Sequence, residues 1–441
     1  MTTFSERLKS HLDRTPEQVA VILQAANQPD SSISYSQLLR GAQGFSHALE
    51  SEGIASGEVV LLILRHGEEL LYSYFGTVVH GAIPSVMSFL TEKLSPERYR
   101  ADLSTLISVT RPAAIVTYGE FVDEARAALK DGDSVRAVIV AENISAQHVD
   151  ISSWGGLKRN PEDIVLLQHS SGTTGLQKGV ALSHQAVFNQ LDAYGKTLGL
   201  NEKDVIVSWL PLYHDMGLIA GFILPVLYGI PLVLMSPFDW VRAPYRLMQS
   251  VSQYKGTLSW LPNFAYNFCA QKIRDRHLTG VDLSTWRAVI NCSEPVHWES
   301  HKIFYEKFKV YGLPENALHS SYAMAENVFA VTQSNLSGRP KVEVIEREAF
   351  MVERVAREAK DKAAITVMSS GHPLPNVQIK IMDETGNELP ECMIGEIALK
   401  SDCMLTGYYN RLDMTGEMFL GGWFVTGDYG YISGGEVFIV F

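Results

Sequence analysis

Short, continuous apolar runs recur along most of this chain, and they constrain its fold more than any other feature. The runs, each long enough for one buried strand, cover residues 59–64, 113–116, 137–140, 164–167, 205–208, 232–235 and 288–291. Amphipathic stretches lie between several of them, and in the one that begins at Ser183 the residues Val187, Leu191 and Tyr194 share one helical face. Strands that are apolar on both faces and alternate with helices are typical of parallel sheets. The sequence therefore predicts an α/β fold of layered, mostly parallel sheets flanked by helices.

The pattern changes after about residue 340. Residues 342–362 are charged and favour a helix, whereas residues 377–381, 395–399 and 423–425 alternate between apolar and polar residues and are separated by turns. Such alternation is typical of short antiparallel strands. We expect one large domain over residues 1–441, with approximate α/β regions at 1–200 and 201–340 and a small antiparallel β-subdomain at 341–441.

Composition excludes several classes of protein. The formal net charge of −12 argues against a nucleic-acid partner, which requires a basic face. The apolar stretch at 218–235 is interrupted by glycines and prolines, so it predicts a helix, a turn and a buried strand rather than a transmembrane segment. The N-terminus has no apolar signal core, and Thr3 and Glu6 predict a capping box at the start of a helix. Four irregularly spaced cysteines favour a reducing, cytoplasmic location.

The strongest chemical signal is a loop rich in glycine and hydroxyl groups that follows the run at 164–167. Its candidate phosphate-binding residues are Ser170, Ser171, Gly172, Thr173, Thr174, Gly175 and Lys178. Glycines allow consecutive N–H groups to face one anion, and the hydroxyls and the lysine add donors. It is not a Walker A loop, because Gln177 precedes Lys178 and Gly179 follows it. A surface turn is the alternative, but the density of donors favours a triphosphate site.

This loop resembles the phosphate loop of the adenylate-forming superfamily, which includes acyl-CoA synthetases, peptide-synthetase adenylation domains and luciferases. The sequence departs from that loop only at Gln177, where proline is usual. The resemblance extends over nearly the whole chain. It implies that ATP and a small-molecule carboxylic acid react to give an acyl adenylate and pyrophosphate. The acyl group then normally passes to a thiol, either CoA or the phosphopantetheine of an acyl carrier protein.

Further motifs imply where the acid would bind. The segment 208–217 resembles one that borders the acyl pocket of relatives, and its His214 would be catalytic. A core histidine, or a His214-Asp215 pair at a helix start, is the alternative that spacing alone favours. The residues that the resemblance places in the acid pocket are Trp209, His214, Asn263, Phe264 and Ser293.

The nucleotide site is implied by three later motifs. Ser293, Glu294 and Pro295 resemble the segment that forms one wall of the adenine pocket, and Tyr322 and Ala323 belong to a motif whose tyrosine stacks on adenine. In that motif Glu326 would hold Mg²⁺ and act in catalysis together with Lys178. Asp428 would accept hydrogen bonds from the ribose hydroxyls. His297 and His301, four residues apart, predict a solvated helix start rather than a zinc site.

Within the superfamily, the segments 209–218, 262–266 and 322–326 look most like fatty acyl-AMP ligases. The family's hinge and its C-terminal lid domain, which bears a catalytic lysine, do not occur before residue 441, so we expect this chain alone to be strongly impaired. Two alternatives stay open. One is a nucleotide-binding or adenylate-binding module with negligible turnover, and the other is an amino-acid adenylation domain, in which Asp215 would meet an ammonium group.

Overall fold

The computed structural model describes residues 2–90, 95–170, 178–360 and 363–440. The chain divides into two compact units, each built from several segments. Unit 1 comprises Met1–Phe188, Leu210–Ser236 and Leu405–Leu412, and unit 2 comprises Asn189–Trp209, Pro237–Met404 and Asp413–Phe441. The division between Phe188 of unit 1 and Asn189 of unit 2 falls within the helix α6 (His184–Leu198).

Unit 1 is an α/β structure in which parallel strands dominate. Its strands are β1 (Val19–Gln24), β2 (Ser31–Ser34), β3 (Val59–Ile63), β4 (Ile83–Val86), β5 (Ala114–Thr117), β6 (Ala137–Val140), β7 (Ile164–Ser170), β8 (Lys178–Ser183), β10 (Leu232–Met235) and β20 (Gly407–Tyr408). Strands β20-β8-β7-β4-β3-β5-β6 form one sheet, parallel from β7 to β6, and β10-β1-β2 are consecutive neighbours elsewhere. Its helices are α1 (Phe4–Arg14), α2 (Tyr35–Ser51), α3 (Glu68–His80), α4 (Pro96–Thr110), α5 (Val122–Ala127), the π-helix η5 (Met216–Ile223) and α7 (Leu224–Tyr228).

The predicted buried strands of this unit are confirmed: β6 and β10 match their predicted runs, and the boundaries of β3, β5 and β7 move by one to three residues. The N-terminal capping box is also present, because the Thr3 hydroxyl accepts from the Glu6 N–H and the Glu6 carboxylate accepts from the Thr3 N–H. The stretch at 218–235 forms η5, α7 and then β10, as its glycines and prolines indicate. Gly229 has a φ of 82° and ends α7 in a left-handed conformation that favours glycine.

Unit 2 combines a second parallel α/β layer with antiparallel sheets. Its strands are β9 (Ile206–Ser208), β11 (Leu258–Leu261), β12 (Ala288–Asn291), β13 (Leu318–Ser320), β14 (Thr332–Gln333), β15 (Val342–Glu346), β16 (Ala364–Met368), β17 (His372–Pro373), β18 (Val377–Met382), β19 (Gly395–Ser401), β21 (Phe419–Leu420), β22 (Trp423–Ser433) and β23 (Glu436–Ile439). Its helices are α8 (Pro237–Arg242), α9 (Tyr245–Tyr254), α10 (Asn263–Lys272) and α11 (Trp298–Phe308), and α12 (Leu412–Glu417) begins at the boundary.

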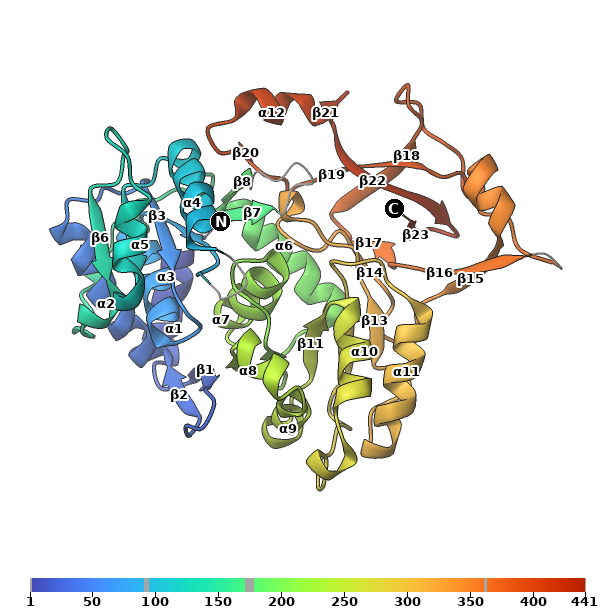
Figure 1. The fold of residues 1–441 in the computed structure, drawn as a ribbon, viewed down its shortest axis with the longest axis horizontal. Helices are drawn as coiled ribbons and strands as arrows, with labels where there is room; N and C mark the ends of the chain where they lie inside the picture. The colour runs from blue at the N-terminus through green and yellow to red at the C-terminus, as the bar shows by residue number, and fades with distance from the viewer. Residues whose placement is uncertain (1, 91–94, 171–177, 361–362, 441) are drawn as a thin grey trace. The chain divides into compact units, whose positions relative to one another are not determined.

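The order β13-β12-β11-β9 is parallel, and β13 lies at the edge. Figure 1 shows α10 and α11 side by side along these strands. The predicted C-terminal antiparallel sheet is confirmed, with the order β18-β19-β22-β21 and β23 paired to β22. A small core of Ile345, Phe350, Ile394, Tyr431 and Phe438 supports this region.

The expectation of a helix over residues 342–362 is wrong. Residues Val342–Glu346 form β15, which pairs antiparallel with β16, and only Ala349–Glu353 form a helical turn, of the π type. The physical reason is local, because Val342, Val344 and Ile345 carry β-branched side chains that favour an extended strand over a helix. The many charged residues in this segment concealed the strand pattern of residues 342–346.

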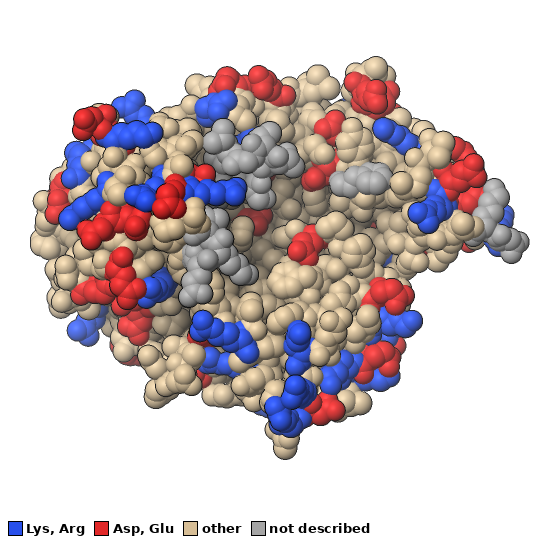
Figure 2. Space-filling model, in the orientation of Figure 1, with Lys and Arg blue, Asp and Glu red and all other residues tan. Residues whose placement is uncertain are grey.

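In the part of the chain that the structure describes, no helix is both long enough and apolar enough to cross a membrane. On the face drawn in Figure 2, acidic and basic side chains are interspersed over the described surface rather than gathered by sign.

Candidate functional site

Tyr322 and Asp428 meet in unit 2. Tyr322 follows β13 and Asp428 lies within β22, and the Tyr322 hydroxyl donates a hydrogen bond of 2.5 Å to Asp428 Oδ2. Burial raises the pKa of Asp428, and the hydrogen bond from Tyr322 opposes that rise. Burial, together with the Asp428 carboxylate, holds the pKa of the Tyr322 phenol well above its usual value. The phenol therefore stays protonated and acts as a donor at neutral pH.

Backbone contacts fix both residues in place. The Tyr322 N–H donates to Thr332 Oγ1 at 3.1 Å, and the Asp428 N–H donates to Thr426 Oγ1 at 3.0 Å. The Thr426 hydroxyl in turn donates to the carbonyl of Ile397 on the neighbouring strand β19, at 2.9 Å. These threonines were not predicted as site residues. The sequence offers a signal only for Thr426, which lies in the same T-G-D turn as Asp428.

The segment Ser293, Glu294 and Pro295 leaves the end of β12 and is exposed. Ser293 has a φ of 66°, a conformation that non-glycine residues adopt uncommonly. Glu294 Oε2 accepts a hydrogen bond of 3.0 Å from the N–H of Phe264, near the start of α10. A carboxylate is favourable there, because the first N–H groups of a helix lack partners within the helix. This contact joins a predicted nucleotide residue to a predicted acid-pocket residue.

Glu326 lies in the 3₁₀ turn Ala325–Asn327, two residues before the fully buried Val328. Val328 has a φ of 63°, which is a genuine outlier for a β-branched residue. Strained backbone of this kind persists only where the surrounding structure holds it. Glu326 is half-buried, and its negative charge contributes to the raised pKa of the Tyr322 phenol. One carboxylate near the tyrosine suits a Mg²⁺ ion that takes its remaining oxygen ligands from phosphates and water.

Two of the predicted acid-pocket residues, Trp209 and Phe264, belong to an aromatic cluster. The rings of Trp209 and Trp240 stack with centroids 3.5 Å apart and planes 4° apart, and Phe264 meets both edge-on at 6.3 and 6.2 Å. Both indoles are buried, whereas Phe264 is 47% exposed. Neither indole N–H has a hydrogen-bond partner among the described residues. Sequence reasoning missed Trp240, because nothing in the short helix α8 marks it as a neighbour of Trp209.

Asn263 serves a structural purpose that the sequence did not indicate. Its Oδ1 accepts hydrogen bonds from the His297 N–H at 3.1 Å and from Asn291 Nδ2 at 3.0 Å. The side chain thus ties the end of β12 to the start of α11. The prediction of a solvated helix start is wrong for His301, which is 2% exposed and stacks on Tyr266 with ring centroids 4.8 Å apart. Tyr266 of α10 packs against this side of α11, so spacing alone could not reveal that His301 is buried.

The remaining predicted residues belong to unit 1. Ser170 ends β7 and Lys178 begins β8, so the two flank the predicted phosphate loop, and Lys178 Nζ lies 5.0 Å from the ring centroid of Tyr408. Ser171, Gly172, Thr173, Thr174 and Gly175 lie outside the described residues. His214 precedes η5, and partial desolvation of its imidazole lowers its pKa. Asp215 caps η5, because its Oδ1 accepts from the Met216 N–H at 2.8 Å.

Comparison with known proteins gives concordant matches. A family model described as AMP-binding enzyme matches residues 8–409. The medium-chain-fatty-acid–[acyl-carrier-protein] ligase JamA of Moorena producens is 26% identical over 433 residues, covering 95% of this chain and 72% of that protein. A Mycobacterium tuberculosis protein named fatty-acid–CoA ligase fadD25 is 27% identical over 434 residues, covering 93% and 73%. The crystal structure of a fatty acyl-adenylate ligase from L. pneumophila, with acyl adenylate and pyrophosphate, is 27% identical, with a TM-score of 0.90 and coverage of 99% and 76%.

Proposed function

This chain belongs to the AMP-binding enzyme family, and we propose that the acid it activates is an apolar carboxylic acid. The general activity follows from the family and from the acyl-AMP ligases and acid–thiol ligases that the chain resembles: it activates a carboxylic acid with ATP. One carboxylate oxygen forms a bond to the α-phosphorus of ATP, the bond from that phosphorus to the bridging oxygen breaks, and pyrophosphate leaves. The product is an acyl adenylate.

The observation that best supports the nucleotide site is the pairing of Tyr322 with Asp428. The two residues lie 106 positions apart and form a hydrogen bond within one unit. In the proposed complex the Tyr322 ring packs against adenine, and the Asp428 carboxylate accepts from the ribose hydroxyls. Ser293, Glu294, Pro295 and Ala323 would complete the adenine wall. The charge of Asp428 suits a diol, because a carboxylate accepts hydrogen bonds and donates none.

The negative charge of the ATP phosphates must be neutralised before the carboxylate of the acid can approach the α-phosphorus. We assign this role to Lys178 and to the loop from Ser170 to Gly175, with Glu326 as the protein ligand of Mg²⁺. Lys178 begins a strand that pairs with β7, so its backbone is fixed at the end of the loop. When bound, Mg²⁺ would withdraw negative charge from the phosphate oxygens and so lower the barrier to attack. His214, whose lowered pKa favours its neutral form, would border the acid carboxylate without repelling ATP-bound Mg²⁺.

The proposed acid is apolar, and the aromatic cluster of Trp209, Trp240 and Phe264 supports this. Aromatic side chains bury large areas of apolar surface on a ligand and fix the orientation of that ligand. JamA is named for medium-chain fatty acids, in agreement with an apolar substrate. The fatty acyl-AMP ligase assignment is therefore favoured over amino-acid adenylation.

The acyl group would pass next to a thiol. The thiol sulfur bonds to the acyl carbon, the bond from that carbon to AMP breaks, and the thiol proton is lost to solvent. Relatives named for an acyl carrier protein and for CoA make both thiols candidates, and we propose the phosphopantetheine of a carrier protein, after JamA. We place the enzyme in the cytoplasm, because Cys269, Cys292, Cys392 and Cys403 are all free thiols.

A pyrophosphate-release assay tests this function. Fatty acids of graded length, an aryl acid and an amino acid are each supplied with ATP and Mg²⁺, with and without CoA or a phosphopantetheinyl carrier protein. We expect slow, acid-dependent release of pyrophosphate with apolar acids, in keeping with the impaired turnover expected from the sequence, and still slower release in Asp428→Asn. Folded protein that binds AMP yet releases pyrophosphate with none of the acids would support the binding-module alternative instead.

A further inference from the structure

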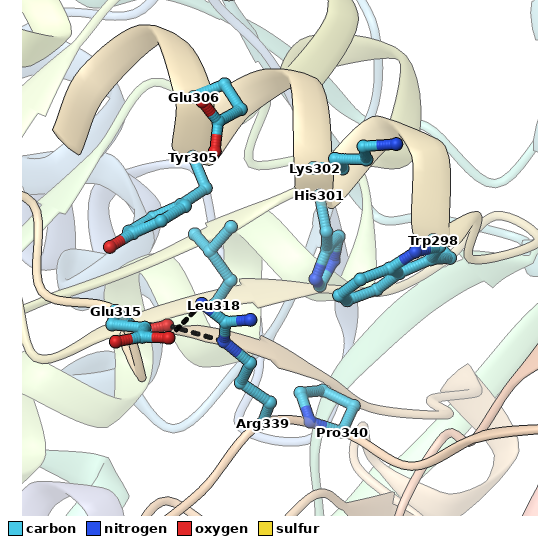
Figure 3. Close-up of a pocket in the computed structure, with 9 residues that line it drawn as sticks. All are labelled: Trp298, His301, Lys302, Tyr305, Glu306, Glu315, Leu318, Arg339 and Pro340. Carbon is cyan, nitrogen blue, oxygen red and sulfur yellow. Dashed lines mark hydrogen bonds and ion pairs between the residues drawn. The ribbon is translucent and has the colours of Figure 1, made fainter.

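Two lysines on the C-terminal antiparallel sheet of unit 2 have no anionic partner among the described residues. Neither Lys380 of β18 nor Lys400 of β19 forms an ion pair or a side-chain hydrogen bond there. By contrast, Arg339 beside α11 donates to Glu315 Oε1 at 2.6 Å, in the hollow of about 350 Å³ drawn in Figure 3. The charges of Lys380 and Lys400 are therefore not neutralised within the sheet.

Both ammonium groups lie over one aromatic ring, that of Trp423 on β22. Lys380 Nζ is 4.7 Å and Lys400 Nζ is 4.6 Å from the centroid of that ring. The strand register accounts for this arrangement. Gln378 pairs with Lys400, so Lys380, two residues further along β18, shares a face of the sheet with both. The register between β19 and β22 places Trp423 on the same face, beside Lys400.

The cluster of Lys380, Lys400 and Trp423 carries two uncompensated positive charges. All three side chains are half-buried. An indole ring attracts a cation through its quadrupole, but it has no net charge, so this contact does not neutralise either lysine. Glu396 shares this face of β19 and forms an ion pair with neither lysine. A ligand group with two negative charges would satisfy both lysines at once, and phosphate is a group that lysine binds as a point charge.

Apolar surface adjoins the two charges. Leu420 of β21 pairs directly with Trp423, so the two side chains share a face, and Leu420 is 52% exposed. Val425, two residues along β22 from Trp423, lies on this face and is half-buried. The face can therefore hold the apolar body of a ligand next to its charged group.

We propose that the cluster of Lys380, Lys400 and Trp423 binds a phosphate monoester that carries an aromatic or other apolar body. The doubly charged phosphate lies between the two ammonium groups, and the body packs against Trp423 and Leu420. None of these four residues is assigned above to the nucleotide or to the acid. No covalent step is involved.

Phenyl phosphate is the probe, and phenyl sulfate is its matched control, because the two have nearly the same shape but the sulfate ester carries a single negative charge. At about pH 8 a phosphate monoester, whose second pKa is about 6, carries nearly two charges. The full chain, labelled with ¹⁵N-tryptophan, is titrated with each compound. The indole N–H resonance of Trp423, identified by its absence in Trp423→Phe, is followed.

We expect a saturable shift of this resonance with phenyl phosphate and an affinity for phenyl sulfate that is about tenfold weaker, because one charge is lost. Inorganic phosphate should also bind about tenfold more weakly, because it has no apolar body to pack on Trp423 and Leu420. Inorganic phosphate that binds as tightly as phenyl phosphate would overturn the assignment of an ester.

Three variants locate the site. Lys380→Gln and Lys400→Gln should each weaken phenyl phosphate binding about tenfold. Lys302→Gln is the matched control and should leave the affinity unchanged, because Lys302 lies on α11 and its Nζ is 3.9 Å from Glu299 Oε2. No saturable shift of the Trp423 resonance, equal affinities for the two phenyl esters, or equal losses in all three variants would overturn the proposal. The measurement needs no turnover, so its outcome is independent of whether the chain adenylates an acid.

Discussion

Tyr322 donates its phenolic hydrogen to Asp428 across 2.5 Å, although the chain separates the two residues by 106 positions. The residue proposed to pack against adenine thus also controls the charge of the residue proposed to hold the ribose. Burial favours the neutral acid of Asp428, and the phenol favours the carboxylate. Nucleotide affinity should therefore depend on pH through this pair.

We expect AMP affinity to fall as the pH is lowered through the raised pKa of folded Asp428, because only the carboxylate accepts from both ribose hydroxyls. Tyr322→Phe keeps an aromatic ring but removes the hydrogen bond that favours the carboxylate. The fall should then begin at a higher pH. Asp428→Asn should bind AMP about 10-fold to 100-fold more weakly and lack this pH dependence. Calorimetric titrations across pH measure both effects, and a shift of the Tyr322→Phe profile to lower pH would contradict the assignment.

Glu326→Gln should weaken Mg·ATP binding by about tenfold or more while leaving AMP binding nearly unchanged. The reason is that the substitution removes a charged oxygen ligand of a cation that only the triphosphate shares. Glu384→Gln is the matched control, since the Glu384 side chain is 85% exposed and remote in sequence from the motif. Equal losses for ATP and AMP in Glu326→Gln would show that the residue supports the strained turn at Val328 instead.

Phe264→Ala should raise KM for an apolar acid about 10-fold to 100-fold without changing KM for ATP, because it removes the exposed edge of the aromatic cluster. The fold should persist, since Phe264 is 47% exposed. Phe419→Ala is the control, because Phe419 is 38% exposed but lies on β21, outside the predicted pocket. An unchanged KM for every acid in the panel would remove Phe264 from the pocket.

The free energy of unfolding should fall as the pH drops from about 6.5 toward 4. Burial lowers the pKa of five histidines to about 3 or 4, namely His66, His169, His184, His301 and His319. In this window the unfolded chain binds protons at these histidines and the folded chain does not, so acid favours unfolding. Urea midpoints measured across pH should show this. His169→Gln should flatten the slope, and the exposed His47→Gln should not; a midpoint that is constant down to pH 4.5 would refute the prediction.

Much of the fold could be predicted because buried strands have a direct signature in sequence. The runs at 232–235 and 288–291 match β10 and β12 residue for residue. The prediction of a helix at 342–362 was wrong because the many charged residues masked the strand preference of the β-branched residues Val342, Val344 and Ile345. Its pairing with β16 is a tertiary contact that propensity does not contain.

The candidate site could likewise be predicted only in part from the sequence. Motif resemblance selected Tyr322 and Asp428, but it did not indicate that the two side chains bond to each other. It also assigned the Glu294 segment to the adenine wall through its backbone, whereas the Glu294 side chain reaches α10. Trp240 escaped notice because its place beside Trp209 depends on how α8 packs. Such side-chain partners arise from three-dimensional packing and leave no fixed spacing in the chain.

The hydrogen bond from the Phe264 N–H to Glu294 has a thermodynamic consequence. One end of this contact lies on the proposed adenine wall, and the other lies at the start of the helix that carries the proposed acid pocket. If nucleotide binding tightens acid binding through this contact by some factor, acid must tighten nucleotide binding by the same factor, because coupling free energy is reciprocal. Glu294→Ala would remove this coupling, so that each substrate would bind with the same affinity whether or not the other is already bound.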